Sequence, residues 1–155
     1  PTVFVPNNGP VLFDDTAPGT TSVTACAPVQ PTSITVSNSV KAYSIASSGA
    51  NNIGGSTGLT KSGSGTLTLS GGANTYTGGT VVNAGILQIG SGGTTGVPGP
   101  GNITNNSALV FNRSDATSDS NFGVISGTGA LVQAGVGARW IRDDGRGFPR
   151  FSRRR

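Results

Sequence analysis

A short apolar pattern recurs along the chain at intervals of 20 to 22 residues, and it constrains the fold more than any other feature. The pattern is Gly or Ser, any residue, Leu, any residue, and a large apolar residue. Gly65–Leu69 aligns with Gly85–Ile89 after 20 residues, and Val81–Ile89 aligns with Ile103–Phe111 after 22. Repeats of this length are typical of solenoids and other repeat architectures.

The alternation inside each copy predicts a β-strand, because successive side chains of a strand point to opposite faces. The Leu and the large apolar residue then share one face, and Thr, Gln or Val lies on the other. Ile34 and Val36, and also Tyr43 and Ile45, alternate in the same way at looser spacing. We predict that six residues form the inner apolar columns: Leu67, Leu69, Leu87, Ile89, Leu109 and Phe111.

Three architectures fit short strands separated by Gly-rich turns: an antiparallel sandwich, a parallel β-solenoid, and a disordered Gly/Ser linker. The chain holds 26 Gly and 9 Pro, no Glu, His or Met, and only 10% charged residues. This composition disfavours helices, and its low charge with 34% hydrophobic content disfavours disorder. Because Asn and Gly keep fixed offsets from each strand, the solenoid is favoured. In a solenoid the glycines supply left-handed corners, and corner Asn side chains hydrogen-bond from coil to coil.

The stretch GLTKSGSGTLTLSGGANTYTGGTVVNAGILQIGSG (Gly58–Gly92) resembles the autotransporter-associated β-strand repeat, also called the passenger-associated transport repeat. Its four matching blocks stand in family order: Gly58–Lys61, Gly65–Leu69, Asn74–Thr80 and Asn83–Gly85. Looser similarity covers Val11–Asp15, Gly101–Asp115 and Gly123–Gly137. The resemblance implies a right-handed parallel β-helix in the secreted passenger of a Gram-negative surface protein, with no catalytic residues in the repeat.

We therefore predict an all-β chain in three parts. Residues 1–30 form an irregular or edge-forming lead-in, in which Pro6–Asp15 contains a turn and a strand at Val11–Phe13. Residues 31–137 form the β-solenoid coils, with the core repeat at 58–92, and Ser91–Gly101 forms an outward loop. Residues 138–155 form a basic tail that does not conform to the pattern. The absence of an initiator Met and of a signal segment indicates an internal fragment of a longer protein.

Sequence features that carry chemistry are sparse. There is no phosphate-loop motif, and without His no Ser–His or Cys–His nucleophile is available within the chain. Asp14 and Asp15 are adjacent and would point to opposite faces of a strand, so they do not form a catalytic pair. Asp115 and Asp119 lie in Arg113–Asn121, which is expected to be a solvated loop and not a calcium site. We therefore expect no enzyme and no catalytic, cofactor-binding or metal-binding residues.

Three further residues are candidates for surface chemistry. Tyr43 and Tyr76 suit a glycan-binding face, although packing of each ring at a coil corner is the favoured interpretation. Cys26 is the single cysteine and permits no internal disulfide. We interpret it as a small buried hydrophobe and not as a reactive thiol.

The basic charge is confined to the tail. Residues 1–138 hold three Lys or Arg against four Asp, whereas residues 139–155 hold seven Arg against two Asp. A looser recurrence at an offset of 72 relates Ile53–Gly65 to Ile125–Gly137, and it predicts a further strand after Gly137 that the tail does not supply. We consider a frameshifted end, a solvated tail, and an arm that binds nucleic acid or an anionic membrane, and we expect no nucleic-acid partner.

These features predict a structural role on the outside of a Gram-negative bacterium. The segment would act as a rigid stalk or scaffold in adhesion or in passenger translocation. Its partners would be the outer-membrane translocator of the parent chain, and surface glycans or host and neighbouring cell surfaces. The alternative is a β-helix module that binds or cleaves glycans.

Overall fold

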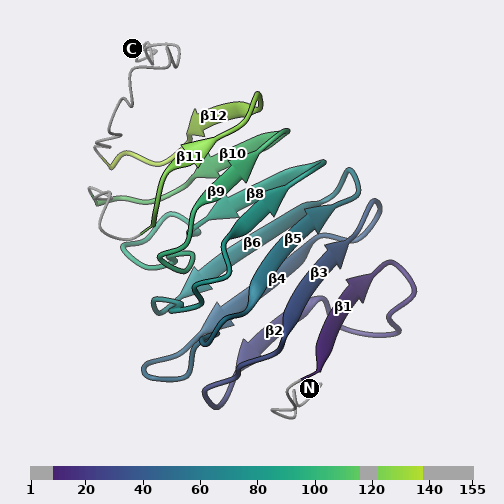
Figure 1. Cartoon of the computed structure of the whole chain (residues 1–155). Coiled ribbons are helices and arrows are strands. Elements are labelled where there is room, and N and C mark those ends of the chain that lie inside the picture. The colour runs from purple at the N-terminus through teal and green to yellow at the C-terminus, as the bar shows by residue number, and fades with distance from the viewer. Residues whose placement is uncertain (1–8, 116–121, 138–155) are drawn as a thin grey trace.

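The computed structural model describes residues 9–115 and 122–137, and within them the chain forms a parallel β-solenoid (Figure 1). Strands alternate between two six-stranded sheets, so every coil contributes one strand to each sheet. The first sheet contains β1 (Pro10–Asp14), β3 (Ser33–Ser37), β5 (Gly58–Ser62), β7 (Thr80–Val82), β9 (Ile103–Asn105) and β11 (Ile125–Ser126). The second contains β2 (Ser22–Ala25), β4 (Tyr43–Ser47), β6 (Thr66–Gly71), β8 (Ile86–Ile89), β10 (Ala108–Phe111) and β12 (Ala130–Gln133).

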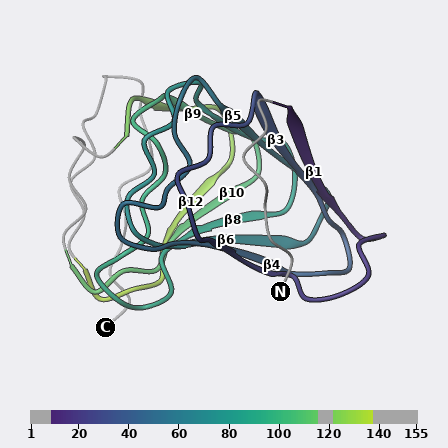
Figure 2. The ribbon, with the colours of Figure 1, turned by 90° about the horizontal axis from the view of Figure 1, so that it is seen from below.

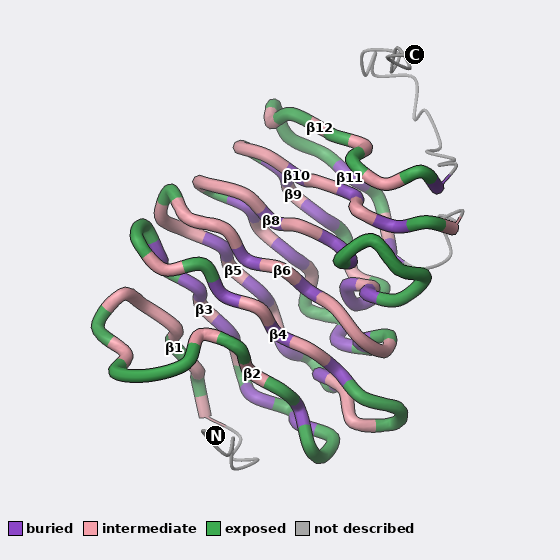
Figure 3. Tube along the Cα trace, turned by 180° about the vertical axis from the view of Figure 1, so that it is seen from behind, coloured by how far each residue is buried: buried purple, intermediate pink, exposed green. Residues whose placement is uncertain are grey.

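The second sheet confirms the predicted inner columns. Leu67, Leu87 and Leu109 are in register across β6, β8 and β10, as are Leu69, Ile89 and Phe111. All six side chains are fully buried, and the alternation of buried and half-buried positions along β6, β8 and β10 is visible in Figure 3. Burial of each such side chain contributes about 1.5–3 kcal/mol. The columns therefore hold this sheet together.

The first sheet shows that the 22-residue alignment is wrong by one residue there. Thr80 pairs with Ile103 and Val82 with Asn105, an offset of 23, whereas Leu87 and Leu109 keep the predicted offset of 22. The turn between β7 and β8 is one residue longer than the turn between β9 and β10. This turn absorbs the difference, so Val82 points inward and Val81 outward.

Irregular segments form the third side of each coil, which Figure 2 shows opposite the meeting edge of the two sheets. Isolated parallel bridges join Val29 to Ile53 and Ala73 to Val97 on this side. The predicted outward loop at Ser91–Gly101 is therefore only partly correct. Ser91–Thr95 is exposed, but the chain turns inward after it and buries Gly96, Pro98 and Gly99.

The stack of coils already begins within the predicted lead-in. β1 is an edge strand and pairs in parallel with β3, and β2 pairs in parallel with β4. Val11 and Phe13 occupy the inward positions that Ile34 and Val36 occupy in the next coil. The first coil thus starts at Pro10, and Pro10 is tolerated because the strand lies at the sheet edge.

The recurrence at an offset of 72 does not relate equivalent positions. Leu59 lies on β5 in the first sheet, whereas Leu131 lies on β12 in the second and is in register with Leu109. Because β12 is itself the counterpart of β6, the register does not call for another strand directly after Gly137. The premise of the frameshift hypothesis is therefore wrong. The tail at 138–155 lies outside the described residues.

Corners between the two sheets use glycine and asparagine as predicted. Gly85 has φ +69°, and a Cβ there would overlap the carbonyl oxygens of Gly63 and Gly65 in the adjacent coil. Corner asparagines bond to the backbone of the next coil and not to one another. Nδ2 of Asn38 donates to the carbonyl of Thr66 (3.0 Å), and Nδ2 of Asn105 donates to that of Ala130 (2.8 Å).

Cys26 is exposed, so its interpretation as a buried hydrophobe is wrong. The inward position at the end of β2 belongs to Ala25, and the next side chain turns away from the interior. Residues 9–115 and 122–137 contain no helix that is long and apolar enough to cross a membrane.

Candidate functional site

Asp14 and Asp15 accept hydrogen bonds that hold turns of the backbone in place. Asp14 accepts hydrogen bonds from Thr16, which lower the pKa of its carboxyl. Asp15 accepts from the backbone N–H groups of Ser39, Val40 and Lys41 in the next coil. These bonds hold the pKa of Asp15 below its usual range as well. In the described part of the chain no three Asp, Glu, His or Cys side chains gather as a metal site requires.

Neither tyrosine presents its ring to a ligand. Tyr43 is inward on β4, its hydroxyl donates to the carbonyl of Asp14 (2.6 Å), and its ring packs against Phe13. Tyr76 lies on the third side with its side chain only 1% exposed. A sugar ring stacks on an exposed aromatic face, so these two residues do not form a glycan site. Tyr76 packs inside the coil, whereas Tyr43 packs within a strand.

Lys61 is a charged residue at an inward position. It lies between Val36 and Val82 in the same column, and its side chain is fully buried. Its ammonium donates to the carbonyls of Ser62 (2.7 Å), Gly63 (2.8 Å) and, in the next coil, Ala84 (3.3 Å). Burial lowers the pKa of this ammonium. Lys61 thus links two coils at a corner, in the same column as Asn105.

Asn74 joins three successive coils on the third side. Its Oδ1 accepts from the backbone N–H of Ile53 (3.1 Å) and from the hydroxyl of Ser47 (2.7 Å), both in the preceding coil. Its Nδ2 donates to the carbonyl of Val97 (2.9 Å) in the following coil. A buried amide with all these partners fixes the spacing of the irregular segments, where no strand ladder does so.

Tyr76 and Thr80 form a buried hydroxyl pair. Their oxygens are 2.8 Å apart, and Thr80 is the polar member of an otherwise apolar inner column that includes Leu59 and Ile103. Burial raises the pKa of the Tyr76 hydroxyl to about 12. The pair anchors the third side to the first sheet, and it is the burial of the ring, not the hydrogen bond with Thr80, that disfavours the ionised form of Tyr76.

This pair predicts an alkaline loss of stability. An unfolded tyrosine ionises near pH 10, so the contribution of Tyr76 is complete below that pH and is lost between pH 10 and about 12. The difference corresponds to roughly 3 kcal/mol. We expect wild-type protein to lose more stability than Tyr76→Phe across this range, measured by urea unfolding at each pH. Tyr43 and Lys61 titrate in both proteins, so parallel losses would contradict the assignment.

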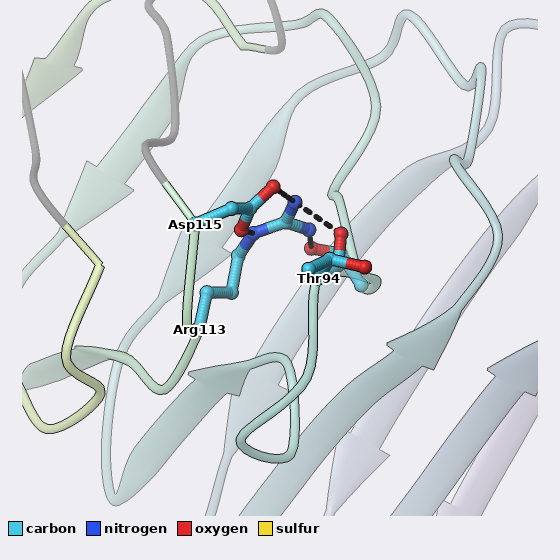
Figure 4. A network of polar contacts seen from close by, with 4 residues as sticks. Thr94, Arg113 and Asp115 are labelled. Carbon is cyan, nitrogen blue, oxygen red and sulfur yellow. Dashed lines mark hydrogen bonds and ion pairs between the residues drawn. The ribbon is translucent and has the colours of Figure 1, made fainter.

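Arg113 anchors the segment after β8 (Figure 4). Its guanidinium donates to the carbonyl of Gly96 (2.6 Å) and to that of Thr94, and it pairs with both carboxylate oxygens of Asp115 at 2.9 and 2.7 Å. Arg113 is 4% exposed, whereas the Asp115 side chain is 37% exposed. The expectation of a solvated loop is therefore wrong for Arg113. Asp119 lies outside the described residues.

Sequence reasoning did not identify these anchors, although one signal was available. Lys61 follows Leu59 by two residues, Arg113 follows Phe111 by two, and Thr80 precedes Val82 by two. Each polar residue thus continues an inward alternation. A polar residue at an inward position must find hydrogen-bond partners, which marks it as an anchor.

Stacked apolar columns with buried polar anchors define a structural β-solenoid of repeated coils. The family model of the passenger-associated transport repeat matches residues 59–89, which run from β5 through β8 and so contain the strands of two successive coils. The chain thus contains a repeat of autotransporter passengers, which Gram-negative bacteria secrete to the cell surface.

A relative points to the same class of protein. The chain is 55% identical over 58 residues to the adhesin BmaC autotransporter of Brucella suis biovar 1 (strain 1330). This match covers 37% of the chain and 2% of the adhesin, so the chain spans a very small part of that relative. No solved structure matches the chain.

Proposed function

We propose that this chain is a rigid, non-enzymatic segment of a secreted autotransporter passenger. It serves as a stalk or scaffold in adhesion, or in carrying the passenger across the outer membrane. The observation that carries the proposal is the unbroken parallel register of both sheets over all their strands. Because each coil buries the apolar face of its neighbour, the stack is stiff along its axis and adds length coil by coil.

The first two partners in this proposal are suggested by the similarity to autotransporter passengers. The outer-membrane translocator of the parent chain is the first, and host or neighbouring cell surfaces are the second. Surface glycans are a further class, because the hydroxyl-bearing residues Thr35, Thr60 and Thr104 belong to one outward column of the first sheet. A glycan array probed with the intact chain tests that class. Binding that is unchanged after Thr60→Val and Thr104→Val would exclude this column.

Surface display tests the structural role. The chain, with an N-terminal epitope tag, is placed between a signal peptide and the barrel of an autotransporter in a Gram-negative host. We expect the tag at the cell surface and a protease-resistant fragment that contains the described coils. An inward substitution that unfolds the coils should reduce both signals, whereas the outward Thr68→Asp should reduce neither. Equal display of all three proteins would contradict a role for the folded stack in passage.

A further inference from the structure

The apolar columns do not by themselves fix the order in which the coils stack. β6, β8 and β10 each present a Leu and a second large apolar residue to the interior, and all six side chains are fully buried. In the first sheet Leu59 faces Thr80 and would fit Ile103 of the following coil equally well. A folding chain that skipped the coil of β7 and β8 would therefore keep apolar contacts between the coils on either side. Misassembly of this kind is characteristic of repeat proteins.

Lys61 differs from these apolar residues because its contacts depend on which coil follows. Its ammonium donates to the carbonyls of Ser62 and Gly63 at its own corner, and to that of Ala84 in the next coil (3.3 Å). Ala84 lies in the three-residue turn between β7 and β8, which ends at Gly85. Gly85 has φ +69°, and a Cβ there would lie 2.9 Å from Nζ of Lys61 and 2.4 Å from the carbonyl oxygen of Gly63. This turn therefore needs glycine to approach the ammonium so closely.

The turn of the following coil does not offer the same site. Between β9 and β10 it has only two residues, Asn106 and Ser107, and no described residue other than glycine has a positive φ. Asn105 precedes this turn in the column of Lys61, and its amide is already engaged. Its Oδ1 accepts from the backbone N–H of Ser107 (3.2 Å), and its Nδ2 donates to the carbonyl of Ala130 (2.8 Å). The shorter turn thus lacks the left-handed glycine that brings a third carbonyl to Lys61.

We propose that Lys61 and the turn at residues 83–85 select the order of the coils. The ammonium is buried between Val36 and Val82, and it reaches all three acceptors only when β5 pairs with β7. A buried charge that loses an acceptor is strongly disfavoured, so pairing of β5 with β9 is rejected. The apolar columns stabilise any stack of these coils, whereas this contact distinguishes the correct stack from one that omits a coil.

Disulfide trapping during refolding tests this selection. In a Cys26→Ser background, Thr60→Cys with Val81→Cys reports the pairing of β5 with β7, because these outward residues are register partners. Thr60→Cys with Thr104→Cys reports the skipped arrangement, since a whole strand separates them in the folded protein. Two strand spacings are about 10 Å, which a disulfide does not span. When the protein with Lys61 refolds from urea in the presence of an oxidant, we expect only the first pair to form an intramolecular disulfide.

Lys61→Met removes the ammonium and keeps a long apolar side chain at the inward position. We expect it to raise the yield of the Thr60 and Thr104 disulfide by about tenfold, at the expense of the Thr60 and Val81 disulfide. Leu59→Met is the matched control, because it alters an inward residue of the same strand but leaves the contacts of Lys61 in place; it should not raise that yield. Non-reducing gels and mass spectrometry measure the products.

Three results would overturn the proposal. The first is a Thr60 and Thr104 disulfide that is equally rare with Lys61 and with Lys61→Met. The second is an equal increase in Leu59→Met, which would indicate general loosening of β5 and not loss of selection. The third is a Lys61→Met protein that does not regain its β signal in circular dichroism on refolding. Lys61 would then be required for folding itself and not for the choice between neighbouring coils.

Discussion

Leu87→Asp is expected to unfold several coils and to cost on the order of 5 kcal/mol, which is comparable with the whole stability of a small domain. Leu87 is fully buried between Leu67 and Leu109, so the new carboxylate would have apolar neighbours in both adjacent coils. A charge without a partner in such a place is strongly unfavourable. Thermal and urea unfolding followed by circular dichroism measure the loss.

Thr68→Asp is the matched control for this substitution. Thr68 lies on β6 next to Leu67 but at an outward position of the same sheet. The same carboxylate there remains in water, and we expect a change within about 0.5 kcal/mol. If both variants unfold at the wild-type temperature, the inward assignment of Leu87 is wrong. If both are equally destabilised, a general intolerance of charge and not burial is the cause.

Arg113→Met is expected to release the segment that follows β8 and to cost about 3 kcal/mol. Met keeps much of the apolar stem of Arg113 but leaves the carbonyls of Gly96 and Thr94 without their charged donor. Hydrogen exchange should increase in residues 91–99 while β6 and β8 keep their protection. Exchange that stays unchanged in residues 91–99 would show that other contacts hold this segment.

Asp115→Asn tests the ion pair separately from the hydrogen bonds that Arg113 donates to backbone carbonyls. It removes the carboxylate but leaves both contacts of Arg113 with backbone carbonyls, and because Asp115 is partly exposed we expect a much smaller effect. The hydrogen bond from Arg113 lowers the pKa of Asp115. The ion pair therefore stabilises the folded protein fully above the usual carboxyl pKa. This stabilisation is lost as the pH falls through the lowered pKa of Asp115 in the folded protein. Asp115→Asn should remove this acid-dependent part only.

Strand faces were predictable because alternation and burial have the same cause. Leu87 and Ile89 share a face in any strand, and only the inner face can accept two large apolar residues per coil. The one-residue error in the first sheet arose at a turn. The apolar pattern fixes the register within a strand but does not fix the length of the turn between Val82 and Ile86.

The third side was not predictable in the same way. Its order depends on single polar contacts between residues far apart in the sequence, such as Asn74 with Val97 and Arg113 with Gly96. No repeat spacing in the sequence indicates which residues make such contacts. The recurrence at an offset of 72 was misleading for a related reason. Glycines occupy corners of every kind in this fold, so Gly63 and Gly135 match in the sequence without matching in space.

The reach of Asn74 into the coils before and after its own has a consequence for how the stack opens. Coils linked only by strand pairing and apolar contact can separate one at a time from an end. Three coils joined through one buried amide must separate together or leave its polar atoms without partners. Opening should therefore proceed from both ends and stop at a central cooperative block. In a stalk under tension, that block would be the part that yields last.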